Sequence, residues 1–296
     1  MTIDVAAGTY DENDTISASD LDSLTIIGAG SSTTTVAGNE AGTVFTIDGG
    51  TVTINDLTIT GGSAGEGGGI YNRYGSNTFT DDTLSNDTTS GNGGAIYNFD
   101  GSDTFIDDTL SSDGADVGGA LFNLEGSDTF IGDTLWNDVA EGAGGGIYNY
   151  AGTDVFTDDT LANDSAPVGG GTFIDTGTET FSASLLSDAG CANSGGSIND
   201  GGYNVESDDS CGFGPTDVVN SSDINLATAL AANGSSGPET LAIDPTSSAF
   251  EEVPPSACAI TTDERGLPRP GVPTQYCDAG AYELQNPSGP PQIATT

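Results

Sequence analysis

Two sets of aspartates recur at a fixed spacing and are the residues in this sequence best suited to chemistry. Within each set, neighbours are 25 or 26 residues apart. The first set is Asp82, Asp108, Asp133 and Asp159, and the second is Asp87, Asp113, Asp138 and Asp164. Stacked strands lie about 4.8 Å apart, so like charges in a column would repel, and a hard cation such as Ca²⁺ would relieve them. We predict these eight as candidate Ca²⁺ ligands; the alternative is a solvated acidic face.

Catalysis finds little support in the same residues. Two carboxylates can hydrolyse a glycosidic bond, but aspartate pairs recur in every repeat and none stands out. The chain has no His, which excludes Ser-His-Asp and Cys-His catalysis. A lyase for acidic polysaccharides needs a basic residue, and the chain has only Arg73, Arg265 and Arg269 in a field of the wrong sign. We expect Arg265 and Arg269 to pair with Asp263, Glu264 or backbone carbonyls, and we assign no catalytic residue.

A third recurring set is aromatic, and each member follows an aliphatic residue that we expect to point inward. Its members are Phe45, Tyr71, Tyr97, Phe122 and Tyr148. Because successive strand residues face opposite sides, these rings should form a strip on the outside. Such a strip could hold sugar rings or a partner protein, so we predict ligand binding at Tyr71, Tyr97, Phe122 and Tyr148. The alternative is that the rings only stack on one another and stiffen the fold.

An asparagine lies two residues after each aliphatic position. The four are Asn72, Asn98, Asn123 and Asn149. By the same alternation they lie inward or at a bend, where side-chain amides can hydrogen bond along a stack. We predict a structural role for them.

All these sets share one period because the sequence repeats about every 26 residues between Ile70 and Phe181. The aliphatic column is Ile70, Ile96, Leu121, Ile147 and Phe173, and the phenylalanine column is Phe79, Phe105, Phe130, Phe156 and Phe181. Each repeat holds three short strand-like runs, and one copy cannot bury its apolar residues without neighbours. We therefore predict an all-β fold, a right-handed, three-sided parallel β-helix with rungs of 25–26 residues.

The chain divides into three parts on this reading. Coils of the β-helix occupy residues 1–186, with the clearest repeats in 67–186. Residues 187–284 should form the last rungs and a C-terminal cap, because uncovered strand edges invite aggregation. Within this part, a capping residue and helical leucine spacing predict a short helix over 222–233. Residues 285–296, QNPSGPPQIATT, include three Pro and are predicted to be a linker or tail.

Charge excludes two classes of partner. Among 296 residues, 3 are basic and 45 acidic, so the formal net charge is 3 − 45 = −42. No basic stripe exists to bind phosphates, which excludes nucleic acid, and the same charge disfavours anionic membranes. No run is long and apolar enough to span a bilayer, so we expect no membrane insertion in this chain.

Four cysteines fall into two close pairs, Cys191 with Cys211 and Cys258 with Cys277. The spacing does not match a zinc site, and the chain has no His to complete a mixed ligand set. We predict two disulfides and therefore a secreted or cell-surface protein, since disulfides persist in oxidising compartments. The start MTIDVAAGTY has no signal-peptide pattern, so any signal peptide is expected to have been removed or to lie upstream.

Several motifs also carry a family resemblance. The repeated GG[AG]IYN resembles the repeats of bacterial surface proteins with pectate-lyase-like β-helices, including polymorphic outer membrane protein repeats. The endings GGYNVESDDSCGFG and TDERGLPRPGVPTQYCDAGAYE are similar to the C-terminal module of choice-of-anchor Q proteins. The resemblance implies a β-helix fold and a secreted or surface-attached context, and it carries over no catalytic residue. This chain has Asp where that family commonly has Asn in the rungs.

We therefore predict a non-catalytic extracellular or cell-surface β-helix with a structural or adhesive role. Its expected ligands are glycans, cell-surface proteins or Ca²⁺. One alternative is a glycoside hydrolase acting on a neutral polysaccharide. Another is a subunit that associates end to end into fibres. The sequence favours a binding module over an enzyme.

Overall fold

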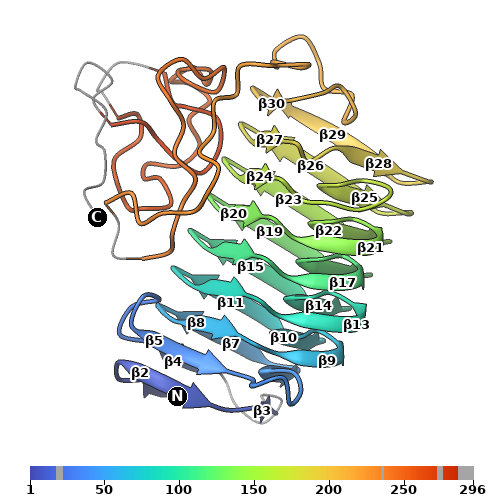
Figure 1. Ribbon diagram of the computed structural model, residues 1–296, viewed down its shortest axis with the longest axis vertical. Helices are drawn as coiled ribbons and strands as arrows, with labels where there is room; N and C mark the ends of the chain where they lie inside the picture. Colours follow the sequence, from blue (N-terminus) through green and yellow to red (C-terminus); the bar gives the residue numbers. More distant parts are fainter. Residues whose placement is uncertain (18–22, 235–236, 272–275, 286–296) are drawn as a thin grey trace.

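The computed structural model describes residues 1–17, 23–234, 237–271 and 276–285, and in this part of the chain it is all-β. The strands stack in parallel into a solenoid whose turns, here called rungs, follow one another along its length (Figure 1). The predicted fold class is thereby confirmed. No helix in the described part of the chain is long and apolar enough to cross a membrane.

Three long parallel sheets form the walls of the solenoid, and each is named here after its recurrent residue. The Phe sheet contains β1 (Thr2–Asp4), β4 (Leu24–Ile27), β7 (Thr51–Asn55), β11 (Ser76–Thr80), β15 (Ser102–Ile106), β19 (Ser127–Ile131), β23 (Thr153–Thr157), β26 (Thr178–Ser182) and β29 (Ser197–Gly202). The Tyr sheet contains β3 (Asp14–Ile16), β6 (Phe45–Asp48), β10 (Ile70–Arg73), β14 (Ile96–Phe99), β18 (Leu121–Leu124), β22 (Ile147–Tyr150), β25 (Thr172–Ile174) and β28 (Cys191–Asn193). The Leu sheet contains β2 (Gly8–Asp11), β5 (Thr34–Ala37), β8 (Thr58–Thr60), β12 (Thr83–Ser85), β16 (Thr109–Ser111), β20 (Thr134–Trp136), β24 (Thr160–Ala162), β27 (Leu185–Ser187) and β30 (Val205–Glu206).

A fourth, short sheet supplements this three-sided plan in the middle of the solenoid. Its strands are β9 (Ser63–Glu66), β13 (Thr88–Asn92), β17 (Gly114–Val117) and β21 (Val139–Ala143). These segments carry few apolar residues and are mostly outside the core, so hydrophobic alternation did not indicate them. They lie between the Leu strand of one rung and the Tyr strand that follows it in sequence.

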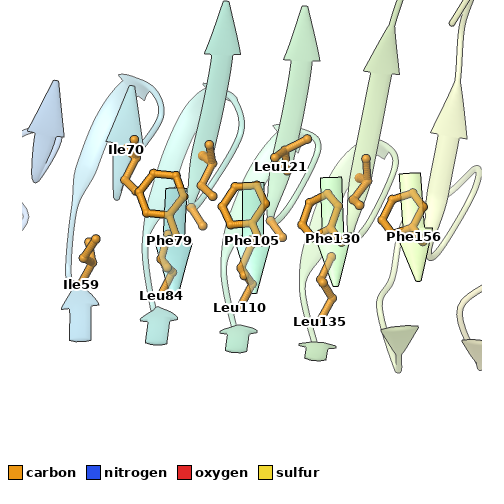
Figure 2. Close-up of a cluster of buried hydrophobic side chains, with 14 of the residues drawn as sticks. Ile59, Ile70, Phe79, Leu84, Phe105, Leu110, Leu121, Phe130, Leu135 and Phe156 are labelled. Carbon is orange, nitrogen blue, oxygen red and sulfur yellow. The ribbon is translucent and has the colours of Figure 1, made fainter. Parts of the chain in front are cut away.

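The core is built from columns of identical residues, as the period predicted. Phe105 pairs with Phe79 on one side and Phe130 on the other, and the ring centroids are 5.0 and 4.7 Å apart. Figure 2 shows these rings in line, with Leu84, Leu110 and Leu135 beside them. All these side chains are fully buried. Stacking one rung on the next therefore buries the same face many times over.

Two residues belong to different columns from those predicted. Phe45 pairs with Ile70, so it lies in the inward aliphatic column and not in the aromatic one. Phe173 pairs with Tyr148, so it extends the aromatic column, while Thr172 continues the aliphatic one. In both places the rung length differs by one residue from the assumed 26, and a shift of one residue exchanges the two faces of a strand.

The doubled aspartates at the turn after each Phe strand have separate tasks. Asp81, Asp107 and Asp158 adopt φ angles of 56°, 58° and 61°. Asp tolerates this left-handed conformation better than most residues, and the equivalent residue in the third repeat is Gly132, at φ 73°. The second aspartate of each pair then points into the interior.

The C-terminal region covers one end of the solenoid and also one side of it. At the end, Phe213 packs on Phe181 with centroids 5.8 Å apart, where the next rung offers Asp200. Residues 224–234, 237–271 and 276–284 then lie along the outside of the Leu sheet, beside β20, β24 and β27 (Figure 1). The sequence predicted a cap at the end of the solenoid but did not predict this contact with its side. Burial on both faces explains why β16 and β24 are buried along their whole length.

Both predicted disulfides are present, Cys191–Cys211 and Cys258–Cys277. They indicate an oxidising environment for the protein. The predicted helix over 222–233 is wrong: this segment is extended, with antiparallel bridges Leu226↔Ile243 and Ala231↔Thr240. Its leucine spacing reflects packing on the solenoid and not a helical face. Most of the predicted tail, 286–296, lies outside the described residues.

Candidate functional site

The first aspartate set forms a buried column in which each carboxylate accepts two backbone N–H groups. Asp108 is representative: its Oδ1 accepts the N–H of Asp82 at 2.7 Å, and its Oδ2 accepts the N–H of Ile106 at 3.1 Å. We call Asp82, Asp108, Asp133 and Asp159 the first carboxylate column. Neutral side chains continue it, because Ser184 accepts from Asp159 and Asn204 accepts from Ser184. The column therefore joins successive rungs.

The second aspartate set is buried as well, but only one oxygen of each carboxylate is used. The Oδ1 atom of each accepts the N–H of the preceding rung at 2.6–2.9 Å. The Oδ2 atoms of all four are buried and have no hydrogen-bond partner among the described residues. We call Asp87, Asp113, Asp138 and Asp164 the second carboxylate column.

A third carboxylate column, which the sequence reading missed, lies on the inner face of the Phe sheet. It contains Asn77, Asp103, Asp128, Asp154 and Glu179, which pair in register and are all buried. Each lies two residues before a core phenylalanine, so strand alternation applied to the Phe column would have found it. Again the second oxygen of every acid has no partner among the described residues.

The predicted asparagine ladder is present and supports this third column. Asn72, Asn98, Asn123 and Asn149 are fully buried. Asn72 Nδ2 donates to Asn98 Oδ1 at 3.1 Å along the stack and to Asp103 Oδ1 at 2.7 Å. Asn98 donates to Asp128 at 2.5 Å, and Asn123 donates to Asp154. The structural role predicted for the asparagines is confirmed.

Burial decides the electrostatics of all three columns. The alternative of a solvated acidic face is wrong for these aspartates, because they are at most 3% exposed. Burial raises the pKa of Asp87 and Asp164 to about 8, and that of Asp103 and Asp154 to about 7. If every carboxyl ionised, neighbours about 4.8 Å apart would repel by roughly 3 kcal/mol at an effective dielectric of about 20.

The Ca²⁺ prediction for the first and second columns remains a prediction. Within the described residues, one group of three candidate ligands has its atoms within 4.8 Å of one another, and it is Cys191, Glu206 and Cys211. Those two cysteines form a disulfide, so they offer no thiolate. The aspartate columns are linear and bring no third carboxylate to the same place, whereas Ca²⁺ takes six to eight oxygens.

In the predicted aromatic ligand strip on the Tyr sheet, Tyr97, Phe122 and Tyr148 are stacked, while Tyr71 meets Tyr97 edge-on at 82°. Tyr97 and Phe122 are parallel within 1° with centroids 5.3 Å apart, and Tyr148 follows at 5.1 Å. Tyr97 is 5% exposed and Phe122 7%, while Tyr71 and Tyr148 are half-buried. Burial, with the nearby charge of Glu66, raises the pKa of Tyr97 to about 12. Mutual stacking, the alternative role, is therefore present, and ligand binding at Tyr71, Tyr97, Phe122 and Tyr148 stays a prediction.

A groove of about 470 Å³ separates the Leu sheet from the C-terminal segment. On the solenoid side it is lined by Trp136, Ala162 and Ser187, which pair in register at the ends of β20, β24 and β27. The facing residues are Ser221, Ser222, Ile224, Asn225, Leu226, Ala227 and Thr228, and the remaining lining residues are Asn163, Asp188 and Ser207. The groove thus offers a half-buried indole among hydroxyl and amide groups.

The sequence reading missed this groove although a signal was present. Trp136 stands where the two preceding repeats have Ser85 and Ser111, and it is the single Trp of the chain. A departure from a strict repeat on an outward-facing position is a mark of local function. The facing wall could not be foreseen, because nothing in the sequence placed residues 221–228 beside it.

Ionic and polar contacts hold the C-terminal segment in place. Thr109 and Thr134 on the Leu sheet donate to the buried carboxylate of Glu264 at 2.8 and 2.5 Å. Burial raises the pKa of Glu264 well above its usual range. Arg265 pairs with Asp263 at 2.5 Å, and its guanidinium lies 3.7 Å from the ring centroid of Tyr282. The predicted pairing of Arg265 with Asp263 is confirmed.

Comparisons with protein-family models, with curated proteins and with solved structures gave no match for this chain. Over the described residues, the fold and the site geometry define a parallel β-solenoid with a groove beside Trp136 and columns of buried carboxylates in its interior.

Proposed function

We propose that this chain is a non-catalytic extracellular β-helix module that binds a neutral glycan in the Trp136 groove. The observation that carries the proposal is the lining of the groove, where an indole lies among hydroxyl, amide and small apolar side chains, with Asp188 as the one acid among its described residues. Sugar rings present an apolar face and a rim of hydroxyls, so they suit an aromatic surface with neutral polar neighbours. A net charge of −42 disfavours polyanionic glycans at the same place.

The groove has too few acidic side chains for hydrolysis, which favours binding. Hydrolysis requires two carboxyl groups across the scissile bond, roughly 5 to 9.5 Å apart. Among the described residues that line the groove, Asp188 is the single acid. The aspartates of the three carboxylate columns are in the interior, where no polysaccharide can reach them.

A cell-surface setting fits the two disulfides and the repeat motifs. The GG[AG]IYN repeats and the DERGLPRP ending resemble pectate-lyase-like surface proteins and the choice-of-anchor Q module. Within the DERGLPRP segment, Glu264 and Arg269 fasten the C-terminal segment to the solenoid, which gives the motif a physical role. The proposed module therefore combines a stiff rod with a groove built by its own C-terminal segment.

End-to-end association is the second candidate, and one observation favours it. Ile3 in the first described rung pairs with the buried Ile26 and points the same way. It is nevertheless 40% exposed, because β1 is the edge strand of the described sheet. At the other end Phe213 lies over Phe181, so head-to-tail stacking would have to displace it. We therefore place glycan binding first.

The test is binding of the full chain to neutral polysaccharides such as β-glucan, mannan and chitin oligosaccharides, with polygalacturonate as the acidic comparison. We expect Trp136→Ala to weaken binding roughly 10-fold or more, because the stacking surface is lost. Tyr150→Ala is the matched control, since it removes an exposed ring of the Tyr sheet away from the groove. Tyr71→Ala tests the aromatic stack separately.

Two results would reject the proposal. One is binding that Trp136→Ala leaves intact while Tyr71→Ala abolishes it, which would move the site to the aromatic stack. The other is release of reducing sugar by the unaltered chain, which would make it a hydrolase.

A further inference from the structure

The three carboxylate columns differ in how many oxygens of each acid accept a hydrogen bond. In the first column both oxygens of each aspartate accept backbone N–H groups, as Asp108 and Asp133 illustrate. In the second and third columns one oxygen per acid is buried without a partner in the described chain. Two N–H donors favour a charged carboxylate, whereas an unpartnered oxygen away from water favours the neutral acid.

The surroundings of the unpartnered oxygens in the second column are small and apolar. A Cβ atom placed on Gly69 would lie 2.7 Å from Asp87 Oδ2, and one on Gly146 would lie 3.1 Å from Asp164 Oδ2. In the two repeats between them the same position is alanine, Ala95 and Ala120, both fully buried. These small side chains offer no oxygen ligand to a cation such as Ca²⁺, which needs six to eight.

The charged groups that face these columns are members of the columns themselves. For the second column the neighbours of Asp113 are Asp87 and Asp138, and Asp164 follows. For the third column the neighbours of Asp128 are Asp103 and Asp154, followed by Glu179. Val52 and Ile198 close the third column at its two ends.

No basic residue compensates either column. The chain has three arginines, no Lys and no His. Arg73 lies over the ring of Tyr71, and Arg265 and Arg269 pair with Asp263 and Asp158. Ionisation of one acid in a column is therefore opposed by burial and by its acidic neighbours, with nothing of opposite sign to offset them.

We propose that the acids of the second and third columns are neutral in the folded protein, so that the rod takes up protons when it folds and loosens when alkali removes them. In the first column burial likewise raises the pKa of the aspartates well above their usual range, but both oxygens of each already accept N–H groups, so we assign no proton to that column. Each neutral aspartate keeps its Oδ1 as acceptor for the neighbouring rung, and Glu179 keeps its Oε1 as acceptor for Thr172. The proton sits on the oxygen that has no donor. Acid would thus stabilise the stack.

The direction of the pH effect follows from linkage. The folded pKa of Asp103 and Asp154 is raised to about 7, and that of Asp87 and Asp164 to about 8, while an unfolded Asp titrates near about 3.9. A raised folded pKa contributes stability that is complete below the unfolded pKa and is lost as pH rises through the folded pKa. The loss is therefore expected between about pH 4 and pH 8.

The test compares isosteric variants of two columns in the full chain. Asp113→Asn with Asp138→Asn removes two protonation sites of the second column but keeps the Oδ1 acceptors. Asp108→Asn with Asp133→Asn is the matched control in the first column, where an amide would face the N–H groups of Ile106 and Ile131. Denaturation is followed from pH 5 to pH 8.5 in EDTA, and again in 1 M NaCl to screen repulsion between surface carboxylates.

We expect the unaltered chain to bind protons on folding at pH 6.5, and the second-column variant to bind about two fewer, with a flatter stability profile. The first-column variant should lose stability at every pH, because its amides face N–H groups that the carboxylates accepted. Infrared spectra of the folded, unaltered chain should show a protonated carboxyl band that disappears on unfolding, a measurement that needs no variant.

Three outcomes would overturn the proposal. The first is stability that rises with pH across this range. The second is a folded second-column variant with the full proton uptake of the unaltered chain, or an infrared spectrum without the protonated band. The third is recovery of stability at pH 8.5 on adding Ca²⁺ to the EDTA-treated protein, which would assign the columns to cations.

Discussion

Arg269 donates to the carboxylate of Asp158 at 2.6 Å, although 111 residues separate them in the sequence. Both side chains are fully buried, and Arg269 also donates to the carbonyls of Gly280 and Asp278. The contact joins the C-terminal segment to the turn that follows Phe156. This buried ion pair therefore fastens the C-terminal segment to the solenoid.

Replacing this arginine tests whether the pair holds the segment. Arg269→Met leaves Asp158 and Glu283 buried without their cation, and we expect a loss of about 3–5 kcal/mol in the free energy of unfolding. Arg73→Met is the matched control, with an expected change within about 0.5 kcal/mol, because Arg73 has no ion pair in the described chain. Urea denaturation measures both, and equal losses would refute a special role for Arg269.

Close contact between rungs requires glycine at position 119. A Cβ on Gly119 would lie 2.0 Å from the carbonyl oxygen of Gly145 in the next rung, so Gly119→Ala must push the rungs apart. We expect a loss of about 3 kcal/mol or more, at the upper end for overpacking. Gly65→Ala meets nothing within 4 Å and should be close to neutral. Thermal melts of the two variants check this, and similar melting temperatures would contradict the rung spacing described.

The phenylalanine column should carry much of the stability of the solenoid. Phe130 is fully buried between Phe105 and Phe156, with centroids 4.7 and 4.9 Å away. Phe130→Ala leaves a cavity and breaks the stack, with an expected cost of about 3–5 kcal/mol. Tyr150→Ala, at an exposed ring, should cost less than about 0.5 kcal/mol. Guanidinium denaturation of each variant provides the comparison; a mild Phe130 variant would mean that the column is not the core.

The second disulfide should stabilise the C-terminal segment more than the solenoid. Cys258 and Cys277 close a loop of 19 residues, and replacing both with serine should cost about 2–4 kcal/mol. Val253 and Cys277 exchange backbone hydrogen bonds, so the same change should expose residues 224–284 to protease before the solenoid. Replacing Cys191 and Cys211 with serine is the control, expected to loosen the end near Phe213. Identical cleavage patterns would show that the two disulfides do not act locally.

The sequence alone determined the fold class, the period and most columns of the interior. A strict repeat lets Phe79, Phe105 and Phe130 be aligned by counting, because parallel stacking places equivalent residues directly over one another. Counting failed where rungs change length, and there Phe45 and Phe173 moved to the other face of their strands. Cysteine spacing likewise predicted both disulfides.

Only the tertiary structure decided which aspartates at the turns are buried and what lies beside Trp136. Side-chain direction at a turn depends on backbone angles that the amino-acid sequence does not specify. Asp81 is therefore partly exposed, whereas the adjacent Asp82 is fully buried. The placement of residues 224–284 depends on contacts such as Glu264 with Thr134, made between parts of the chain 130 residues apart. A contact that occurs only once leaves no periodic pattern in the sequence.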